Sequence, residues 1–336
     1  MRHENGVPTK QWFALLVIST VAGGMNVAPG PAPKQTSVVR AVSDEFLQVA
    51  DTSSKMVRIT GGTGATDGLA YSRLAYLLFS DLGQDAILKY TPALKFVSGR
   101  SIGETVTDAP LTTFRKPGGG VRGLTFDRQG RLLACESAAR RVTRTEKNGR
   151  LTVLASRYRD RPLNGPRDVV HAIDGSTYFT DPERDDGRGG NAAAPGVYQI
   201  TRTGELRLVA SGFSRPTGVT LSPDHRILYC SDAAGQIRAF DIVPDGSLGP
   251  ARTLAAIVPE RGVSAGGIKT DVDGRLYCAG PGGIWVFDRQ GKHLGMLSTP
   301  EPATNLGWGD DYSALYVAAG TSLYRIALKV AGARTF

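Results

Sequence analysis

One motif recurs along this chain of 336 residues, and its clearest copy reads Arg122-Gly123-Leu124-Thr125-Phe126-Asp127-Arg128-Gln129-Gly130-Arg131-Leu132-Leu133-Ala134-Cys135-Glu136. A strand-like run opens the motif, a polar turn ending in glycine follows, and a second apolar run closes it. Two such runs joined by a glycine turn are typical of a β-hairpin. The six copies begin at Asp67, Arg122, Arg167, Thr217, Gly266 and Asn305.

The spacing of the copies predicts the fold. They are separated by 55, 45, 50, 49 and 39 residues, which suits a repeat of four strands. Two more strand-like runs lie between copies, for example 141–145 and 151–155, with a turn at Asn148-Gly149. A four-stranded sheet cannot bury both faces alone, whereas six sheets around an axis cover one another. We therefore expect an all-β, six-bladed β-propeller over 56–330, in preference to two stacked sandwiches, which would not repeat one motif six times.

The last blade needs a strand from elsewhere in the chain. Only one clear run, 322–329, follows the final copy of the motif. A strand near 56–59 is expected to complete this blade, which would join the two ends of the propeller.

Composition narrows the function classes. Hydrophobic residues make up 41% of the chain, and 42 glycines and 19 prolines suit many tight turns. The formal net charge is +9, but basic residues are scattered among acidic ones without a nucleic-acid-binding motif. We expect no nucleic-acid partner, and we interpret the charge as an aid to solubility.

The N-terminal segment has the layout of an export signal. Polar residues that include Arg2 and Lys10 precede an apolar stretch over 12–22, and a loop rich in glycine and proline follows. The sequence predicts a signal-peptide-like leader over 1–28, a linker over 29–55 with a short helix within 37–50, and a C-terminal tail over 331–336. Export to the periplasm or outside the cell is expected. An uncleaved leader that anchors the chain is the alternative, because no clean Ala-x-Ala cleavage site is present.

The cysteines and one histidine are predicted to be structural. Cys135, Cys230 and Cys278 follow strand-like runs in separate repeats, so they are expected to be buried, free thiols. The same separation argues against a zinc site. His171 lies on a predicted inner strand, and we expect a buried imidazole with a hydrogen-bond partner.

Several motifs together resemble one family. They are 123–132, Arg161-Pro162-Leu163-Asn164-Gly165-Pro166, 174–182, and Ser222-Pro223-Asp224 followed by Leu228-Tyr229. These stretches are similar to the gluconolactonase and regucalcin (senescence marker protein) family, whose members are six-bladed propellers that hydrolyse sugar lactones with a divalent metal. The resemblance covers about 56–329. It implies a metal such as calcium at one mouth of the central channel, held by oxygen ligands.

The metal positions of the family carry other residues in this chain. The family motifs Glu-Gly-Pro, Asn-Asp-Val, Pro-Asn-Gly and Asp-Gly read here as Asp67-Gly68-Leu69, Arg167-Asp168-Val169, Pro216-Thr217-Gly218 and Gly266-Gly267. A further family asparagine is Arg122 here. A guanidinium is always charged and only donates hydrogen bonds, so Arg167 would repel a cation. We expect the side chains of Asp67, Arg122, Arg167, Thr217 and Asn305 to converge at the channel mouth, and we expect no metal site there.

Two functions remain open from the sequence. One is a lactone hydrolase acting on carboxylic ester bonds, with a displaced cation at Asp67, Asp168 or Asp181. The other is a non-catalytic propeller in which Arg122 and Arg167 bind a small anionic or sugar-acid-like molecule, or a protein partner. Each has a structural alternative. In the first, Asp81, Glu136, Asp181 and Asp232 only accept hydrogen bonds from turns. In the second, Asp67 or Asp168 only neutralises the arginines.

Overall fold

A computed structural model describes residues 38–97, 100–104, 110–184, 191–260 and 262–334. The predicted leader at 1–28 and the first part of the predicted linker lie outside these residues. Within them, no helix is both long enough and apolar enough to cross a membrane.

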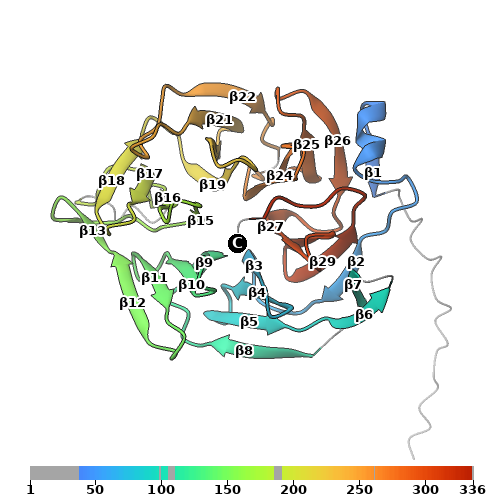
Figure 1. The fold of residues 1–336 in the computed structure, drawn as a ribbon, viewed down its shortest axis with the longest axis horizontal. Helices are drawn as coiled ribbons and strands as arrows, with labels where there is room; N and C mark the ends of the chain where they lie inside the picture. Colours follow the sequence, from blue (N-terminus) through green and yellow to red (C-terminus); the bar gives the residue numbers. More distant parts are fainter. Residues whose placement is uncertain (1–37, 98–99, 105–109, 185–190, 261, 335–336) are drawn as a thin grey trace, which may run out of the picture. The chain divides into compact units, whose positions relative to one another are not determined.

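The described chain forms six antiparallel sheets around a central axis (Figure 1). The first blade contains β3 (Thr66–Ser72), β4 (Tyr76–Asp81), β5 (Ala86–Tyr90) and β8 (Leu111–Arg115). The second contains β9 (Val121–Phe126), β10 (Leu132–Glu136), β11 (Arg141–Thr145) and β12 (Leu151–Ala155). The third contains β15 (Val169–His171), β16 (Thr177–Asp181), β17 (Gly196–Ile200) and β18 (Leu206–Ala210).

The remaining blades follow the same order from the axis outward. The fourth contains β19 (Pro216–Leu221), β20 (Ile227–Asp232), β21 (Gln236–Asp241) and β22 (Arg252–Ala256). The fifth contains β23 (Ile268–Thr270), β24 (Leu276–Gly280), β25 (Gly283–Phe287) and β26 (His293–Ser298). The sixth contains β27 (Ala303–Gly309), β28 (Ala314–Ala319) and β29 (Ser322–Ala327), with β2 (Val57–Thr60) as its outer strand. The predicted six-bladed propeller is confirmed.

Strand β2 closes the propeller as the sequence predicts. Val57 pairs with Arg325, and Thr60 pairs with Leu323. Because β2 precedes the first blade in the chain and completes the last, hydrogen bonds between strands hold the two ends of the ring together.

The described part of the expected linker is folded rather than extended. Strand β1 (Val39–Ala41) pairs with β26 as a fifth strand of the fifth blade, and a short 3-10 helix, η1 (Asp44–Gln48), follows. Phe46 and Val49 are fully buried against this blade and its neighbour. These apolar side chains explain why the segment docks, and the predicted helix within 37–50 is shorter than expected.

Two small hairpins lie outside the four-stranded blades. Strands β6 (Ala93–Val97) and β7 (Arg100–Glu104) pair with each other between β5 and β8, which accounts for the long first repeat spacing. Strands β13 (Arg157–Tyr158) and β14 (Arg161–Pro162) pair between the second and third blades.

The core lies between neighbouring sheets. Six apolar clusters occupy the six blade interfaces; one joins Leu69 and Phe79 of the first blade to Tyr316 of the sixth. The described part of the expected tail also packs on the ring, because the Gly332 and Ala333 amides donate to the carbonyls of Tyr312 and Thr270. Each sheet thus buries both faces, and the inner strands remain around the axis.

Candidate functional site

The inner strands lie around the axis (Figure 1) and pair with the second strands in one common register. In each blade one apolar residue pairs with an equivalent residue of the second strand: Leu69 with Phe79, Leu124 with Ala134, Val169 with Phe179, Val219 with Cys230, Ile268 with Cys278, and Leu306 with Val317. We call the residues two places earlier the entrance positions: Asp67, Arg122, Arg167, Thr217, Gly266 and Thr304. We call the residues one place earlier the second positions: Gly68, Gly123, Asp168, Gly218, Gly267 and Asn305.

The sixth blade departs from the expected register. The sequence places Asn305 at the entrance, but the pairing of β27 with β28 shifts between Ala303 and Asn305. Similar shifts occur in the first, second and fourth blades, so the register is set by the paired apolar residue. Leu306 is the equivalent of Leu69, which gives Thr304 the entrance position and Asn305 the second position. The expected register at Asn305 is therefore corrected by one residue.

Asp67 is the centre of a buried polar cluster. Its Oδ2 accepts a hydrogen bond from Arg122 Nη1 at 3.1 Å. Its Oδ1 accepts from Asn305 Nδ2 at 3.1 Å and from the Gly68 amide at 2.9 Å. Asn305 thus joins the predicted site residues despite its shifted register. Both carboxylate oxygens of Asp67 are used within the protein.

Arg167 lies beside this cluster. Burial lowers the pKa of its guanidinium; Asp67 opposes that shift, while the like charges of Arg122 and Arg215 add to it. Arg122 and Arg167 line one cavity of about 280 Å³ at this end of the channel. We call this cavity the arginine mouth; its other lining residues are Leu82, Gly120, Ser137, Ala138, Gly165, Pro182, Glu183, Arg184 and Arg215.

Sequence reasoning missed Arg184 and Arg215. Arg184 follows the end of β16, and Arg215 directly precedes β19. Both segments adjoin the entrance end of a blade. Their position next to the repeated motif was therefore the sequence feature that could have identified these two arginines as lining residues. They bring the number of arginines that line the mouth to four.

Two of the family's metal positions offer no oxygen to the cavity. The Thr217 hydroxyl donates to the Ala265 carbonyl at 2.9 Å and lies 2.9 Å from the Ser231 hydroxyl, so it links backbone rather than facing the mouth. Gly266 has no side chain, and a Cβ there would collide with the Thr304 carbonyl oxygen. The structure therefore brings Asp67, Arg122, Arg167 and Asn305 together but turns Thr217 away.

Asp168 and Asp181 have other partners. Asp168 Oδ2 accepts the Val219 amide at 3.1 Å and lies 3.8 Å from Lys269 Nζ; burial raises the pKa of this carboxyl. Asp181 accepts the amides of Asn164 and Gly165 at 2.8 and 2.7 Å.

The carboxylates that end the second strands are structural. Asp81 accepts the amides of Gly64 and Gln84, and Asp232 accepts those of Ser214 and Arg215, in the same way as Asp181. Glu136 differs, because it pairs with Arg115 and Arg141. No group of three or more His, Cys, Asp or Glu that could hold a metal ion occurs within the described ranges.

The histidine and cysteine predictions are confirmed. His171 is buried, with Nδ1 3.0 Å from the Thr177 hydroxyl, and burial lowers its pKa. Cys135, Cys230 and Cys278 are free and buried.

The fold and the mouth define a class of protein: a six-bladed propeller whose polar site opens at one end of the channel. The family model described as SMP-30/Gluconolactonase/LRE-like region matches residues 65–321, more than half of the chain. The chain therefore belongs to the SMP-30/gluconolactonase family.

Individual relatives agree with this assignment. The chain is 26% identical over 341 residues to a gluconolactonase of Zymomonas mobilis, covering 95% of this chain and 94% of that protein. A solved gluconolactonase from Xanthomonas campestris is 26% identical, with a TM-score of 0.75 and coverage of 90% and 99%. A calcium-binding regucalcin from Agrobacterium tumefaciens, at 18% identity and a TM-score of 0.63, shares the fold, with coverage of 80% and 92%.

Proposed function

We propose that the arginine mouth binds a small anionic molecule of the sugar-acid type, and that this anion takes the place of a divalent cation. One observation carries the proposal. Asp67 is the only carboxylate at the entrance positions, and Arg122, Asn305 and Gly68 already occupy both its oxygens.

The donor set does not fit a calcium ion. Calcium takes six to eight oxygen ligands. At the four positions implied by the family, Asp67 is engaged, Arg167 is a cation, the Thr217 hydroxyl bonds to backbone, and Gly266 has no side chain. A guanidinium a few Å from a divalent cation would oppose its binding by several kcal/mol in a partly desolvated channel.

The same groups suit a carboxylate. A guanidinium presents planar N–H donors that match two carboxylate oxygens, and charge-assisted hydrogen bonds are stronger than neutral ones. Arg122 keeps 31% of its side chain exposed although it pairs with Asp67. Arg167 lies further in, at the edge of the same cavity. An anion between them would add to the negative charge of Asp67 and of Glu183, which lines the same cavity as the four arginines.

Calorimetry with gluconate and, separately, with calcium chloride tests the proposal. We expect gluconate to bind the wild-type protein and calcium to give no heat of binding. Arg167→Met should weaken gluconate binding about tenfold or more, because it removes one charge-assisted contact. Arg252→Met is the matched control, since Arg252 pairs with Asp241 on an exposed outer strand. Micromolar calcium binding, or unchanged gluconate affinity in Arg167→Met, would contradict the proposal.

Lactone hydrolysis is the second candidate, favoured by the family and by the similarity to the Zymomonas enzyme along nearly the whole chain. In this case Arg122 and Arg167 would stabilise the negative charge that develops on the lactone carbonyl oxygen when water attacks. A pH-indicator assay with glucono-lactone, run with and without EDTA, measures this activity. We expect any turnover above the spontaneous rate to persist in EDTA and to fall in Arg167→Met; turnover abolished by EDTA would point to a metal.

Export remains a proposal based on the sequence of residues 1–28. Fractionation of cells that express the full chain, with a variant in which Leu15 and Leu16 are replaced by Asp, would test it. Equal distribution of both proteins would count against an export signal.

A further inference from the structure

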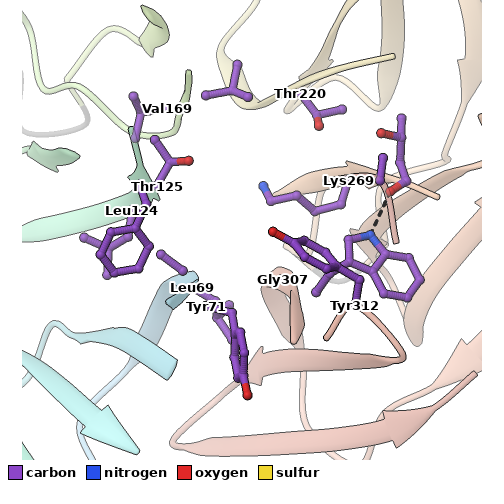
Figure 2. Close-up of a pocket in the computed structure, with 15 residues that line it drawn as sticks. Leu69, Tyr71, Leu124, Thr125, Val169, Thr220, Lys269, Gly307 and Tyr312 are labelled. Carbon is purple, nitrogen blue, oxygen red and sulfur yellow. Dashed lines mark hydrogen bonds between the residues drawn. The ribbon is translucent and has the colours of Figure 1, made fainter. Parts of the chain in front are cut away.

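The channel has a second opening at the other ends of the inner strands. The narrow part of this opening has a volume of about 40 Å³. Each inner strand contributes to its lining the residue three places after the entrance position: Ala70, Thr125, Val170, Thr220, Lys269 and Gly307. Five of these residues are uncharged and mostly small, and one is a lysine. We call this part the throat; Figure 2 shows Lys269 extending from its wall into the opening.

Lys269 has donors to offer to a ligand. Its side chain is only 15% exposed, so its charge is largely removed from bulk water, which is costly without partners. An ammonium has three N–H donors, and one of them reaches the Ile268 carbonyl at 3.0 Å. Asp168 Oδ2 is 3.8 Å away, which allows ionic attraction but is too long for a hydrogen bond. Asp168 holds a second position, so it lies nearer to the arginine mouth than Lys269 does. Lys269 itself lies in the wall of the throat.

The walls around the ammonium combine threonines with apolar side chains. Leu69, Leu124 and Val169 line the throat, together with Phe126 and Trp308. Tyr71 and Tyr312 line both the throat and a wider cavity of about 710 Å³ outside it. Figure 2 shows Tyr312 on the same side of the opening as Lys269. A mostly apolar cavity with a few polar groups is the usual form of a small-molecule site.

Two turns beside this wider cavity place residues other than glycine in the left-handed backbone conformation. In the hairpins between the first two strands of blades two, three and five, the left-handed position is glycine: Gly130, Gly175 and Gly274. His225 holds the same position in the fourth blade, with φ 57°, and its side chain lines the cavity. In the sixth blade Asp310, Asp311 and Tyr312 are all left-handed, with φ of 51°, 54° and 66°.

These backbone conformations cost free energy for residues other than glycine, most of all for a bulky one. Glycine makes the equivalent turns in three sister blades, so closing the fourth-blade hairpin does not require His225. The sixth-blade turn is a different one, with four residues between the paired Gly309 and Ala314 against five between Phe126 and Leu132. Strained residues cluster at ligand sites. The strain at His225 therefore points to a role for its side chain, which lines the cavity and whose Nδ1 accepts a hydrogen bond from the Ile173 amide at 3.3 Å.

We infer that the throat and its outer cavity form a second ligand site, for a small carboxylic acid with an apolar or aromatic body. The carboxylate accepts hydrogen bonds from Lys269, and the body lies against Tyr71 and Tyr312. This site is separate from the arginine mouth and does not depend on the function proposed for it.

Calorimetry with phenylacetate tests the inference, with phenylacetamide as a neutral probe of the same shape. We expect phenylacetate to bind and the amide to bind at least about tenfold more weakly. Lys269→Met should weaken phenylacetate binding by a similar factor. Lys292→Met is the matched control, because Lys292 is exposed and pairs with Glu45 at the protein surface.

Two further measurements keep the inference falsifiable if Lys269→Met folds poorly. Tyr312→Leu should weaken phenylacetate binding without affecting gluconate binding, and saturating gluconate should leave phenylacetate affinity unchanged. Full phenylacetate affinity in a folded Lys269→Met protein would overturn the inference, since Arg73 or Arg334 of the outer cavity would then hold the carboxylate. Competition between the two acids would overturn it as well, because it would indicate a single site.

Discussion

Individual residues at the channel entrance give it a charge pattern unlike the one that the family resemblance implies. The resemblance to the family implies neutral and acidic oxygen ligands, whereas here Arg122 and Arg167 flank the single carboxylate of Asp67. Residue type and motif spacing were enough to predict that these three lie together. Arg184, Arg215 and Lys269 could not be assigned in this way, because their positions depend on how segments from different blades approach the axis.

Gly266 lies where the backbone of the next blade approaches too closely to leave room for a side chain. A Cβ at this position would collide with the Thr304 carbonyl of the next blade. We expect Gly266→Ala to destabilise the protein by about 1–3 kcal/mol, as overpacking does. Urea unfolding followed by tryptophan fluorescence measures the change. The control is Gly249→Ala, whose Cβ would lie 3.5 Å from its nearest neighbour, the Asp241 carbonyl oxygen, at ordinary contact distance.

The same close approach would hinder the introduction of a metal ligand at Gly266. Replacing Gly266 by Asp would meet the same collision before the carboxylate could act as a ligand. If Gly266→Ala and Gly249→Ala proved equally stable, the entrance would be more tolerant than the geometry indicates.

At the scale of the elements, the repeat predicts the strands well and their attachments less well. The runs at 141–145 and 151–155 are strands with the expected limits, because alternation and a glycine turn are local properties. Strand β1 was not predicted as part of a blade, since its pairing with β26 joins residues far apart in the chain. The one-residue error at Asn305 has another cause. Aligning Asn305 with Asp67 makes Gly307 the equivalent of Leu69, whereas the strand pairing gives that place to Leu306.

Strand β2 should matter more to stability than its four residues suggest, because it closes the ring. Ile59 is fully buried in the interface between the first and last blades. We expect Ile59→Ala to cost about 2–4 kcal/mol, through lost burial and the cavity left behind. Thermal unfolding should show one cooperative transition at a lower Tm.

Ile173→Ala is the control for this experiment, since Ile173 is 54% exposed. It should change stability by no more than about 0.5 kcal/mol. A similar small effect for Ile59→Ala would mean that the ring does not depend on this strand.

Across the whole molecule, burial between blades decides the chemistry of the cysteines. All three thiols lie in blade interfaces, and burial raises the pKa of each, in Cys278 to about 12. Because the thiolate is the reactive form, we expect no reaction of the native protein with Ellman's reagent at neutral pH. In denaturant three thiols per chain should react; rapid labelling of the native protein would contradict the burial described above.

The repeated motif, its spacing and the run at 322–329 contain enough local information to specify a six-bladed propeller closed by an N-terminal strand. Residue types at the repeat starts also indicate a basic mouth in place of the family's metal ligands. Tertiary structure alone decided that Thr217 bonds to backbone, that Asn305 reaches Asp67 from a second position, and that Lys269 lies in the throat. Those outcomes depend on contacts between blades, where one residue of register or one bulge moves a side chain from a cavity into the core.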